Sequence, residues 1–217
     1  GPLCARAACV ASAMRLLPVA CAAAVAVAHV HEESLRAFRA SARAPAAFEE
    51  VRCRIGSDDP GGARGDVTFV LRADWAPLAC AAFRERVAAG FYDGLRFFRV
   101  VPNFIAQVGF HPSWNGTRWP KVGRDERRED ARNRRGTAAF AGSSKTQIFV
   151  NLADNKHLDR EGGVFAEVTP PGMDVFDAIF TGYREGTGQI KAYNRGVDAL
   201  MREFPRMSHI ERCRLVR

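Results

Sequence analysis

An arginine stands inside an apolar stretch of the sequence, FYDGLRFFRVVPNFIAQVG at residues 91–109. Arg99 lies between Phe98 and Val100, so its guanidinium must emerge among aromatic and aliphatic side chains. A guanidinium is a hydrogen-bond donor that keeps its charge, and in an apolar pocket it can stabilise an acceptor that develops during a reaction. A paired arginine in a hydrophobic core gives the same local pattern. Both interpretations of Arg99 stay open on this stretch alone.

Other side chains with reactive groups give weaker patterns. His157 is close in sequence to Asp154 and Asp159, which would suit a metal site or an acid–base pair, but a solvated loop histidine is favoured. The six cysteines never form a C-x-x-C pair. No metal site and no cofactor are therefore predicted.

Three cysteines, Cys53, Cys80 and Cys213, belong to the predicted folded body. Cys53 and Cys213 lie near its first and last predicted strands, which often meet in a closed barrel, so a bridge between them is one alternative. Unbridged cysteines are among the most buried residue types in proteins. The sequence favours two buried thiols at these positions over a disulfide.

The chain has a net charge of +8, which comes mainly from two segments. Residues 118–135 and 182–217 each hold eight lysines and arginines against four acidic residues. Because acids are interleaved with bases in both segments, a solvated surface of mixed charge is expected. No recognition helix, zinc finger or RNA-binding aromatic motif accompanies the charge, so no nucleic-acid partner is predicted.

The first 31 residues contain two arginines and no acid, and Leu16–Val30 is an uncharged run of 15 residues apart from His29. From Met14 the pattern is typical of a signal peptide, with AVA before His29 as a small-residue cleavage site. A transit segment and a short membrane anchor are the alternatives, although a spanning helix needs about 17 to 25 residues. We expect a lumenal protein of the secretory pathway or plastid. A membrane-anchored form and a mitochondrial location are the alternatives.

The rest of the chain predicts one mainly β domain. The boundary falls near Ala47, which separates a targeting or anchor segment with its linker (1–47) from the body (48–217). Short apolar segments bounded by glycine, proline and aspartate predict strands. Two segments predict helices, the first with Asp74 as its cap and Pro77 in its first turn, the second beginning at Met173. Many short strands with two helices indicate a closed antiparallel barrel capped by helices. The strand segments are 48–56, 66–73, 96–102, 105–109, 136–141, 147–152 and 163–168, with a last strand near Cys213.

Two stretches together carry a resemblance to a known family. F-x-R-V-x-P-x-F-x-x-Q-x-G in residues 97–109 is followed in order by T-Q-x-F, L-D, V-F-x-x-V and G-M-D-V-x-D. In this order and spacing the chain resembles the cyclophilin family of peptidyl-prolyl isomerases over about residues 48–217. The resemblance implies an eight-stranded antiparallel barrel, and the tail GQIKAYNRGVDALMREFPRMSHI resembles a subgroup with a helical insertion before its final strand.

The resemblance also implies roles for individual side chains. Arg99 would be the catalytic arginine and Gln107 would hydrogen-bond the substrate backbone. Ala141 would flank the same groove, and His157 stands where many members have a tryptophan. Four apolar residues would wall the pocket for the proline ring: Phe104, Ile105, Phe149 and Leu158.

The sequence departs from the family pattern in the groove beside that pocket. The histidine that precedes the arginine in the family is Phe98 here, and a second pocket histidine matches Gly162. The asparagine of the family's A-N segment aligns with Gly142, and the loop between Phe140 and Gln147 is shorter.

Two functions from different classes follow. The first is an isomerase that rotates X-Pro bonds of proline-containing polypeptides and assists folding as a chaperone. The alternative is a catalytically weak subunit that binds proline within a larger, membrane-associated complex. Retention of Arg99, Phe104, Gln107 and Phe149 favours the enzyme, while Phe98 and Gly162 favour the alternative.

Overall fold

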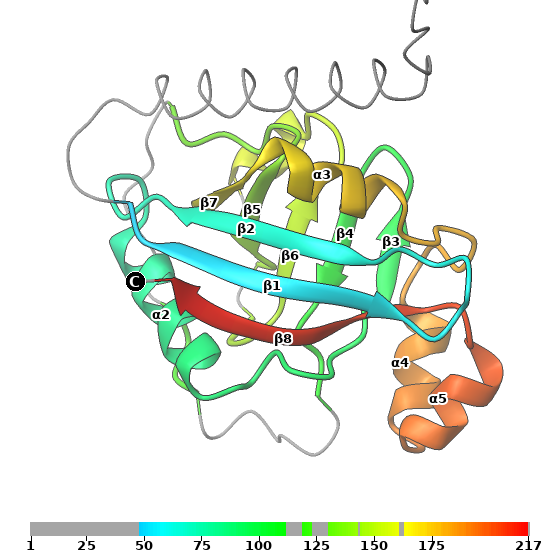
Figure 1. Cartoon of the computed structure of the whole chain (residues 1–217). Helices are drawn as coiled ribbons and strands as arrows, with labels where there is room; N and C mark the ends of the chain where they lie inside the picture. Colours follow the sequence, from blue (N-terminus) through cyan, green and yellow to red (C-terminus); the bar gives the residue numbers. More distant parts are fainter. Residues whose placement is uncertain (1–47, 112–118, 123–129, 143, 161–162, 217) are drawn as a thin grey trace, which may run out of the picture.

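Eight strands form one antiparallel sheet in the computed structural model (Figure 1). The structure describes residues 48–216 except 112–118, 123–129, 143 and 161–162. Each strand coincides with a segment that the sequence predicts as a strand, whereas the predicted N-terminal segment 1–47 lies outside the described residues. The strands are β1 (Glu50–Ser57), β2 (Gly65–Leu71), β3 (Arg99–Val101), β4 (Ile105–Val108), β5 (Thr137–Phe140), β6 (Ile148–Asn151), β7 (Val164–Val168) and β8 (Ser208–Val216).

The sheet curls until its two ends approach each other. The strand order is β3-β4-β6-β5-β7-β2-β1-β8, so β3 and β8 lie at the two ends. The chain just before β3 joins them, because Phe97 N donates to Ser208 O (3.0 Å) and Ile210 N donates to Leu95 O (2.9 Å). The predicted eight-stranded antiparallel barrel is confirmed, with its closure made by this short segment instead of a full strand pair.

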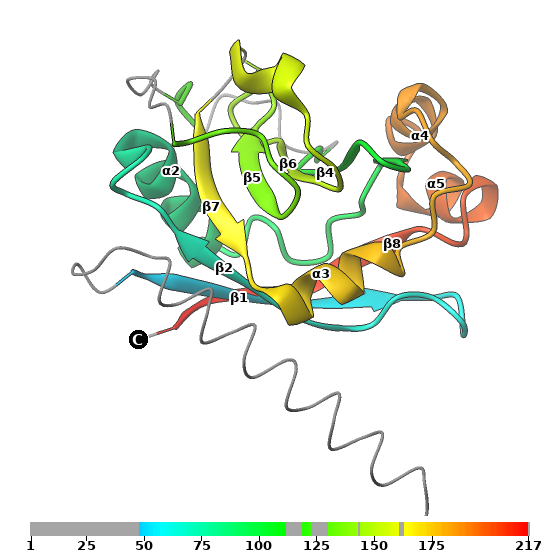
Figure 2. The ribbon, with the colours of Figure 1, turned by 90° about the horizontal axis from the view of Figure 1, so that it is seen from above.

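Four helices accompany the sheet in the described part of the chain. They are α2 (Pro77–Ala88), α3 (Pro170–Asp177), α4 (Thr187–Tyr193) and α5 (Val197–Glu203). Figures 1 and 2 show α2 at one end of the barrel, α3 along β2, and α4 with α5 together at the opposite end. The prediction of two capping helices accounts for α2 and α3, and α4 with α5 matches the helical insertion implied by the family resemblance.

Both capping helices begin at a proline. The prediction that Asp74 caps the first helix is wrong, because α2 begins at Pro77 and the Asp74 carboxylate accepts two hydrogen bonds from Arg72 (2.9 and 2.7 Å). Likewise α3 begins at Pro170, before the predicted start at Met173. Proline suits the first turn because the N–H that it lacks has no partner there.

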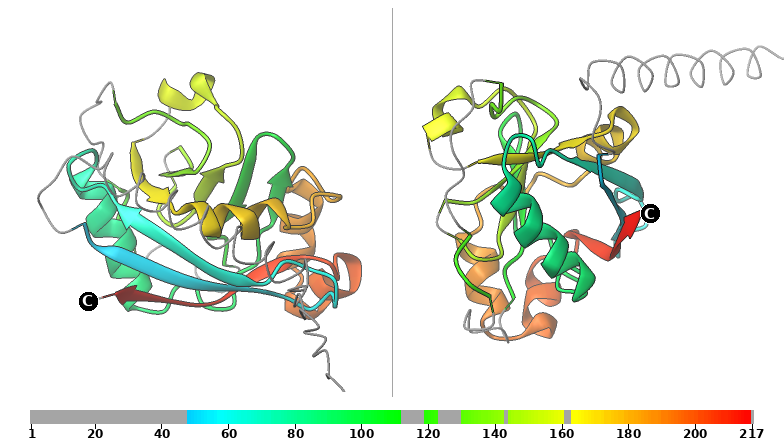
Figure 3. Two further views of the ribbon diagram at one scale, coloured as in Figure 1. Left: turned by 45° about the horizontal axis from the view of Figure 1, so that its top comes forward. Right: turned by 90° about the vertical axis from the view of Figure 1, so that its left-hand side faces the viewer.

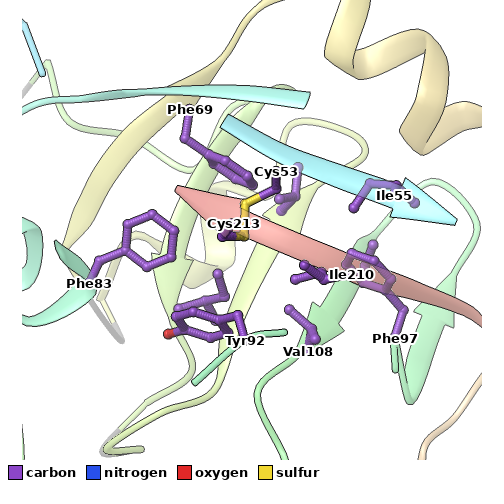
Figure 4. A pocket seen from close by; sticks show the side chains of 12 residues that line it. Cys53, Ile55, Phe69, Phe83, Tyr92, Phe97, Val108, Ile210 and Cys213 are labelled. Atoms are coloured by element: carbon purple, nitrogen blue, oxygen red, sulfur yellow. A yellow bond between two sulfur atoms is a disulfide. The ribbon is translucent and has the colours of Figure 1, made fainter. Parts of the chain in front are cut away.

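The barrel interior is packed with aromatic rings. Phe83 of α2 meets Phe69 (centroids 5.7 Å apart), Tyr92 (5.3 Å) and Phe165 (5.0 Å). In the right-hand view of Figure 3, α2 lies in front of the curled sheet, so these contacts close that end of the barrel. A small cavity remains inside, lined by apolar side chains from β1, β2, β4, β6 and β8 (Figure 4).

A disulfide joins the first and last strands in this interior (Figure 4). Cys53 and Cys213 are direct partners in the β1–β8 register, with their Cα atoms 4.0 Å apart. The Cys213 N–H donates to Asp93 Oδ1 (2.8 Å). The expectation of two buried thiols is therefore wrong. The register places Cys53 directly opposite Cys213, so both side chains point to the same face of the sheet. Cys80 keeps its thiol, which donates to the Phe165 carbonyl (3.2 Å).

The α4–α5 insertion has a core of its own. Its buried residues include Ala192, Tyr193 and Leu200, and they pack with Phe98 from the segment before β3. Phe110 also meets Phe98 (centroids 6.0 Å apart) and Tyr193 (5.7 Å). The insertion is thus anchored at the residue that precedes Arg99.

None of the helices within the described ranges has the length and apolar character needed to cross a membrane.

We predict that breaking the Cys53–Cys213 disulfide lowers the free energy of unfolding by about 2–5 kcal/mol. The bridge closes 160 residues of chain, so its loss releases much conformational entropy in the unfolded state. Urea titration of oxidised and reduced protein measures the change. The double variant Cys53→Ala/Cys213→Ala is the control, because its stability should no longer respond to reductant. Equal stability of oxidised and reduced wild type would contradict the prediction.

Candidate functional site

Three neighbouring strands bring the main predicted site residues into one row. In the ladder, Arg99 of β3 is opposite Gln107 of β4, and Gln107 is opposite Phe149 of β6. Residues directly opposite each other in antiparallel strands point to the same face of a sheet. Arg99, Gln107 and Phe149 therefore share a face.

This face is the outer side of the barrel. Ala106 and Val108 alternate with Gln107 along β4 and line the interior cavity, as do Ile148 and Val150 of β6. Because side chains alternate across a strand, Gln107 and Phe149 point away from that cavity. The interior cavity and the candidate site are consequently on opposite sides of the same strands.

The Arg99 guanidinium is partly exposed and held by polar groups and a ring. Its side chain is 27% exposed. Nη1 donates to Gln107 Oε1 (3.4 Å), and Cζ lies 5.4 Å from the centroid of the Phe104 ring. Glu185 forms an ion pair with Nε (2.8 Å). Arg99 is thus paired and partly buried, and it lies on the outer face of the barrel and not in its interior.

The Gln107 amide is oriented by a second glutamine. Its Nε2 donates to Gln147 Oε1 (2.9 Å), which leaves Oε1 facing Arg99. Gln147 follows the short loop after β5, and Ser144 Oγ accepts its N–H (2.9 Å). The predicted groove residue Ala141 begins this loop and donates its N–H to Gln147 O (2.9 Å). The short loop therefore holds one end of the row.

Of the other predicted residues, His157 lies against Phe104. The His157 ring stacks on the Phe104 ring, with centroids 5.5 Å apart and planes 22° apart. His157 is exposed and Leu158 is half-buried, both in the 3-10 helix η1 (Lys156–Arg160). Ile105 shares the face of Gln107 by alternation but is almost fully buried. Phe104 and His157 are thus in direct contact.

A buried amide network fixes Phe104 and η1, and sequence reasoning missed it. Asn155 Nδ2 donates to the Phe104 carbonyl and to Asn151 Oδ1, both at 2.8 Å. Asn151 Nδ2 donates in turn to Asn133 Oδ1 (3.1 Å). The sequence signal for this network is Asn151, an amide at the end of an apolar strand. Its side chain is fully buried in the structure, and a buried amide requires hydrogen-bond partners.

The two aspartates near His157 in the sequence accept hydrogen bonds from backbone N–H groups. Asp159 Oδ1 accepts the Asn133 N–H (2.7 Å), and Asp154 Oδ1 accepts the Arg135 N–H (2.9 Å). Neither contact involves His157. Over the described ranges, no group of three or more histidine, cysteine or acidic side chains is arranged to hold a metal ion.

A fully buried arginine ties α2 to the loops near the row. Arg86 donates to the carbonyls of Lys145 (2.7 Å), Ala82 (2.6 Å) and Pro120 (3.2 Å), and it lies 5.0 Å from the Trp119 ring centroid. Burial lowers the pKa of the Arg86 guanidinium. Because carbonyls accept its N–H groups, this arginine connects structural elements.

The residues at which the sequence departs from the family pattern, Phe98 and Gly142, lie in different environments. Phe98 is buried in the core of the α4–α5 insertion. Gly142 has φ +52°, a left-handed conformation that asparagine also tolerates, and a Cβ there would meet nothing within 4 Å. Gly162 lies outside the described residues.

Comparisons with known proteins identify the family of this chain. The family of cyclophilin-type peptidyl-prolyl cis-trans isomerases matches residues 57–195. Peptidyl-prolyl cis-trans isomerase A of Dickeya dadantii is 34% identical over 135 residues, which cover 57% of this chain and 70% of that protein. Peptidyl-prolyl cis-trans isomerase B of Escherichia coli is 33% identical over 129 residues, covering 53% and 78% respectively.

A solved structure shares the fold. A cyclophilin-type peptidyl-prolyl cis-trans isomerase of Cryptosporidium parvum superposes with a TM-score of 0.57 at 18% identity, covering 78% of this chain and 98% of that one. Fold, motif order and family match define a peptidyl-prolyl isomerase of the cyclophilin type. This chain belongs to the cyclophilin family, whose members act on proline-containing polypeptides.

We predict that Asn155→Ala lowers the free energy of unfolding by about 1–3 kcal/mol, because it leaves Asn151 Oδ1 buried without its donor. Urea titration at constant pH measures the change. Exposed Asn194 supplies the matched control, and Asn194→Ala should alter stability by less than about 0.5 kcal/mol. If the two substitutions lower the free energy of unfolding equally, the amide network does not stabilise the fold as predicted.

Proposed function

We propose that Arg99 and Gln107 catalyse rotation of X-Pro peptide bonds at this face of the barrel. Resonance sets a barrier of about 18–20 kcal/mol to that rotation, and unaided X-Pro bonds interconvert over tens to hundreds of seconds. The twisted transition state loses the resonance, and the proline nitrogen gains a lone pair. A donor directed at that nitrogen binds the twisted state better than either planar state.

One observation carries the proposal: a partly exposed guanidinium lies over the Phe104 ring and opposite Gln107 in the ladder. Arg99 supplies a guanidinium, a charged group that carries several N–H donors and no acceptor. Gln107 orients it and supplies an amide for the substrate backbone. The apolar side chains Phe104, Ile105, Phe149 and Leu158 would receive the proline ring, with Ala141 and His157 beside them.

The expected magnitude is moderate. A hydrogen bond from a charged group contributes about 1.5–3 kcal/mol, which corresponds to roughly tenfold to more than a hundredfold in rate. Removal of water around the proline ring by the apolar residues would supply the remainder, because electrostatic interactions strengthen in a dry site.

Arg99→Ala should therefore lower kcat/KM on an X-Pro peptide by roughly tenfold to a hundredfold or more, with little change in melting temperature. Arg99→Lys should also lose most activity while remaining folded, since lysine keeps the charge but lacks the planar fork. Arg195→Ala is the matched control, an exposed arginine paired with Glu203 in the insertion. Full activity of Arg99→Ala would overturn the proposal. Wild type without activity that still binds proline peptides would favour the alternative of a binding subunit.

We also propose that the body works in an oxidising lumen of the secretory pathway or plastid. Support comes from the Cys53–Cys213 disulfide, since disulfides persist mainly in oxidising compartments, and from the apolar, acid-free N-terminal sequence.

Protease added to sealed organelles should spare the protein until detergent is present. Blotting against the body before and after detergent measures this. If the protease digests the protein completely while the organelles are sealed and no detergent is present, the lumenal proposal is wrong.

A further inference from the structure

The loop that leads into the α4–α5 insertion brings a carboxylate to Arg99. Glu185 lies in the loop before α4, where its Oε2 accepts from Arg99 Nε (2.8 Å) and its Oε1 accepts from Nη2 (3.4 Å). Gln107 accepts from Nη1 on another side of the guanidinium. The negative charge facing the proposed catalytic group therefore comes from an element outside the strand ladder.

The loop that carries Glu185 is fixed against β3. Val100 N donates to Arg184 O (3.2 Å), which forms a bridge between loop and strand. Gly186 lies so close that a Cβ would be 2.8 Å from the Phe98 ring and 3.2 Å from Arg99 Cβ. Since Phe98 belongs to the core of the insertion, docking of α4 and α5 itself holds Glu185 beside Arg99.

The two partners differ in exposure. The Glu185 side chain is 66% exposed, against 27% for Arg99. An ion pair of this kind is weak, so a competing charge can separate it. A carboxylate is nevertheless a stronger acceptor for a guanidinium than a neutral amide group. Glu185 thus occupies Nε and Nη2 of Arg99, while most of its own side chain stays open to solvent.

We infer that Glu185 is a specificity-determining residue that selects substrates with a lysine or arginine beside the proline. With a neutral or acidic neighbour, Glu185 stays on Arg99 and weakens its donation to the proline nitrogen. A basic neighbour attracts the carboxylate and releases the guanidinium. This inference rests on the proposed role of Arg99. The strength of an exposed pair, up to about 1 kcal/mol, limits the effect to about fivefold.

The test measures kcat/KM of the full chain on three otherwise identical peptides that carry lysine, alanine or glutamate beside the proline. Glu185→Gln should raise kcat/KM about two- to fivefold on the alanine and glutamate peptides and leave the lysine peptide nearly unchanged. The difference between wild type and variant should shrink in about 1 M salt, where the screening length falls to about 3 Å.

Glu203→Gln is the matched control, because Glu203 is an exposed glutamate of the same insertion that pairs with Arg195 instead of Arg99. It should change none of the three values. An unchanged or lower kcat/KM for Glu185→Gln, a rise equal on all three peptides, or the same pattern in Glu203→Gln would overturn the inference.

The two proposals fail in different ways. If Arg99→Ala is as active as wild type, the proposed function itself is wrong. If Arg99→Ala is inactive but Glu185→Gln shows no gain that depends on the peptide's charge, the catalytic role of Arg99 stands and only the inference about Glu185 is wrong.

Discussion

The hydrogen-bonded ladder of β3, β4 and β6 sets the geometry on which the site depends. Its register puts Arg99, Gln107 and Phe149 side by side on the outer face, while their neighbours Ala106 and Val150 fill the interior. A slip of one residue would reverse both faces at once, moving the guanidinium inward and apolar side chains into water. The packing that stabilises the barrel therefore also fixes the position of the charged group.

The insertion is coupled to this ladder through one aromatic side chain. Where the family resemblance implies a histidine, Phe98 lies in the core formed by Tyr193, Leu200 and other apolar residues of the insertion. Since Phe98 is adjacent to Arg99 in the chain, the insertion docks beside the proposed catalytic group. The departure at Phe98, which favours the weakly catalytic alternative in the sequence, thus has a packing role against the added helices.

Much of this arrangement could be predicted from the sequence, because strand alternation and motif order are local properties of the chain. Arg99, Gln107 and Phe149 lie in short apolar segments that the sequence predicts as strands, and the spacing of their motifs resembles that of the family. Contacts between distant segments could not be predicted in this way. The Cys53–Cys213 disulfide depends on a register across 160 residues, and the Arg99–Glu185 pair depends on how the insertion docks. Pro77 is in the first turn of α2 as predicted, but the predicted cap Asp74 accepts hydrogen bonds from Arg72 instead.

Three arginines show why sequence alone left the role of Arg99 open. Arg86 is fully buried and satisfied by backbone carbonyls, so it connects elements. Arg72 is paired with Asp74 and Glu167 and lies 3.7 Å from the Trp75 ring centroid, so its charge is neutralised within the fold. Arg99 also contacts a ring and a carboxylate, but its carboxylate partner is mostly exposed and it stands on the outer face of the ladder. A guanidinium can act on a substrate only where its partner can be displaced, and among these three arginines that condition is met at Arg99.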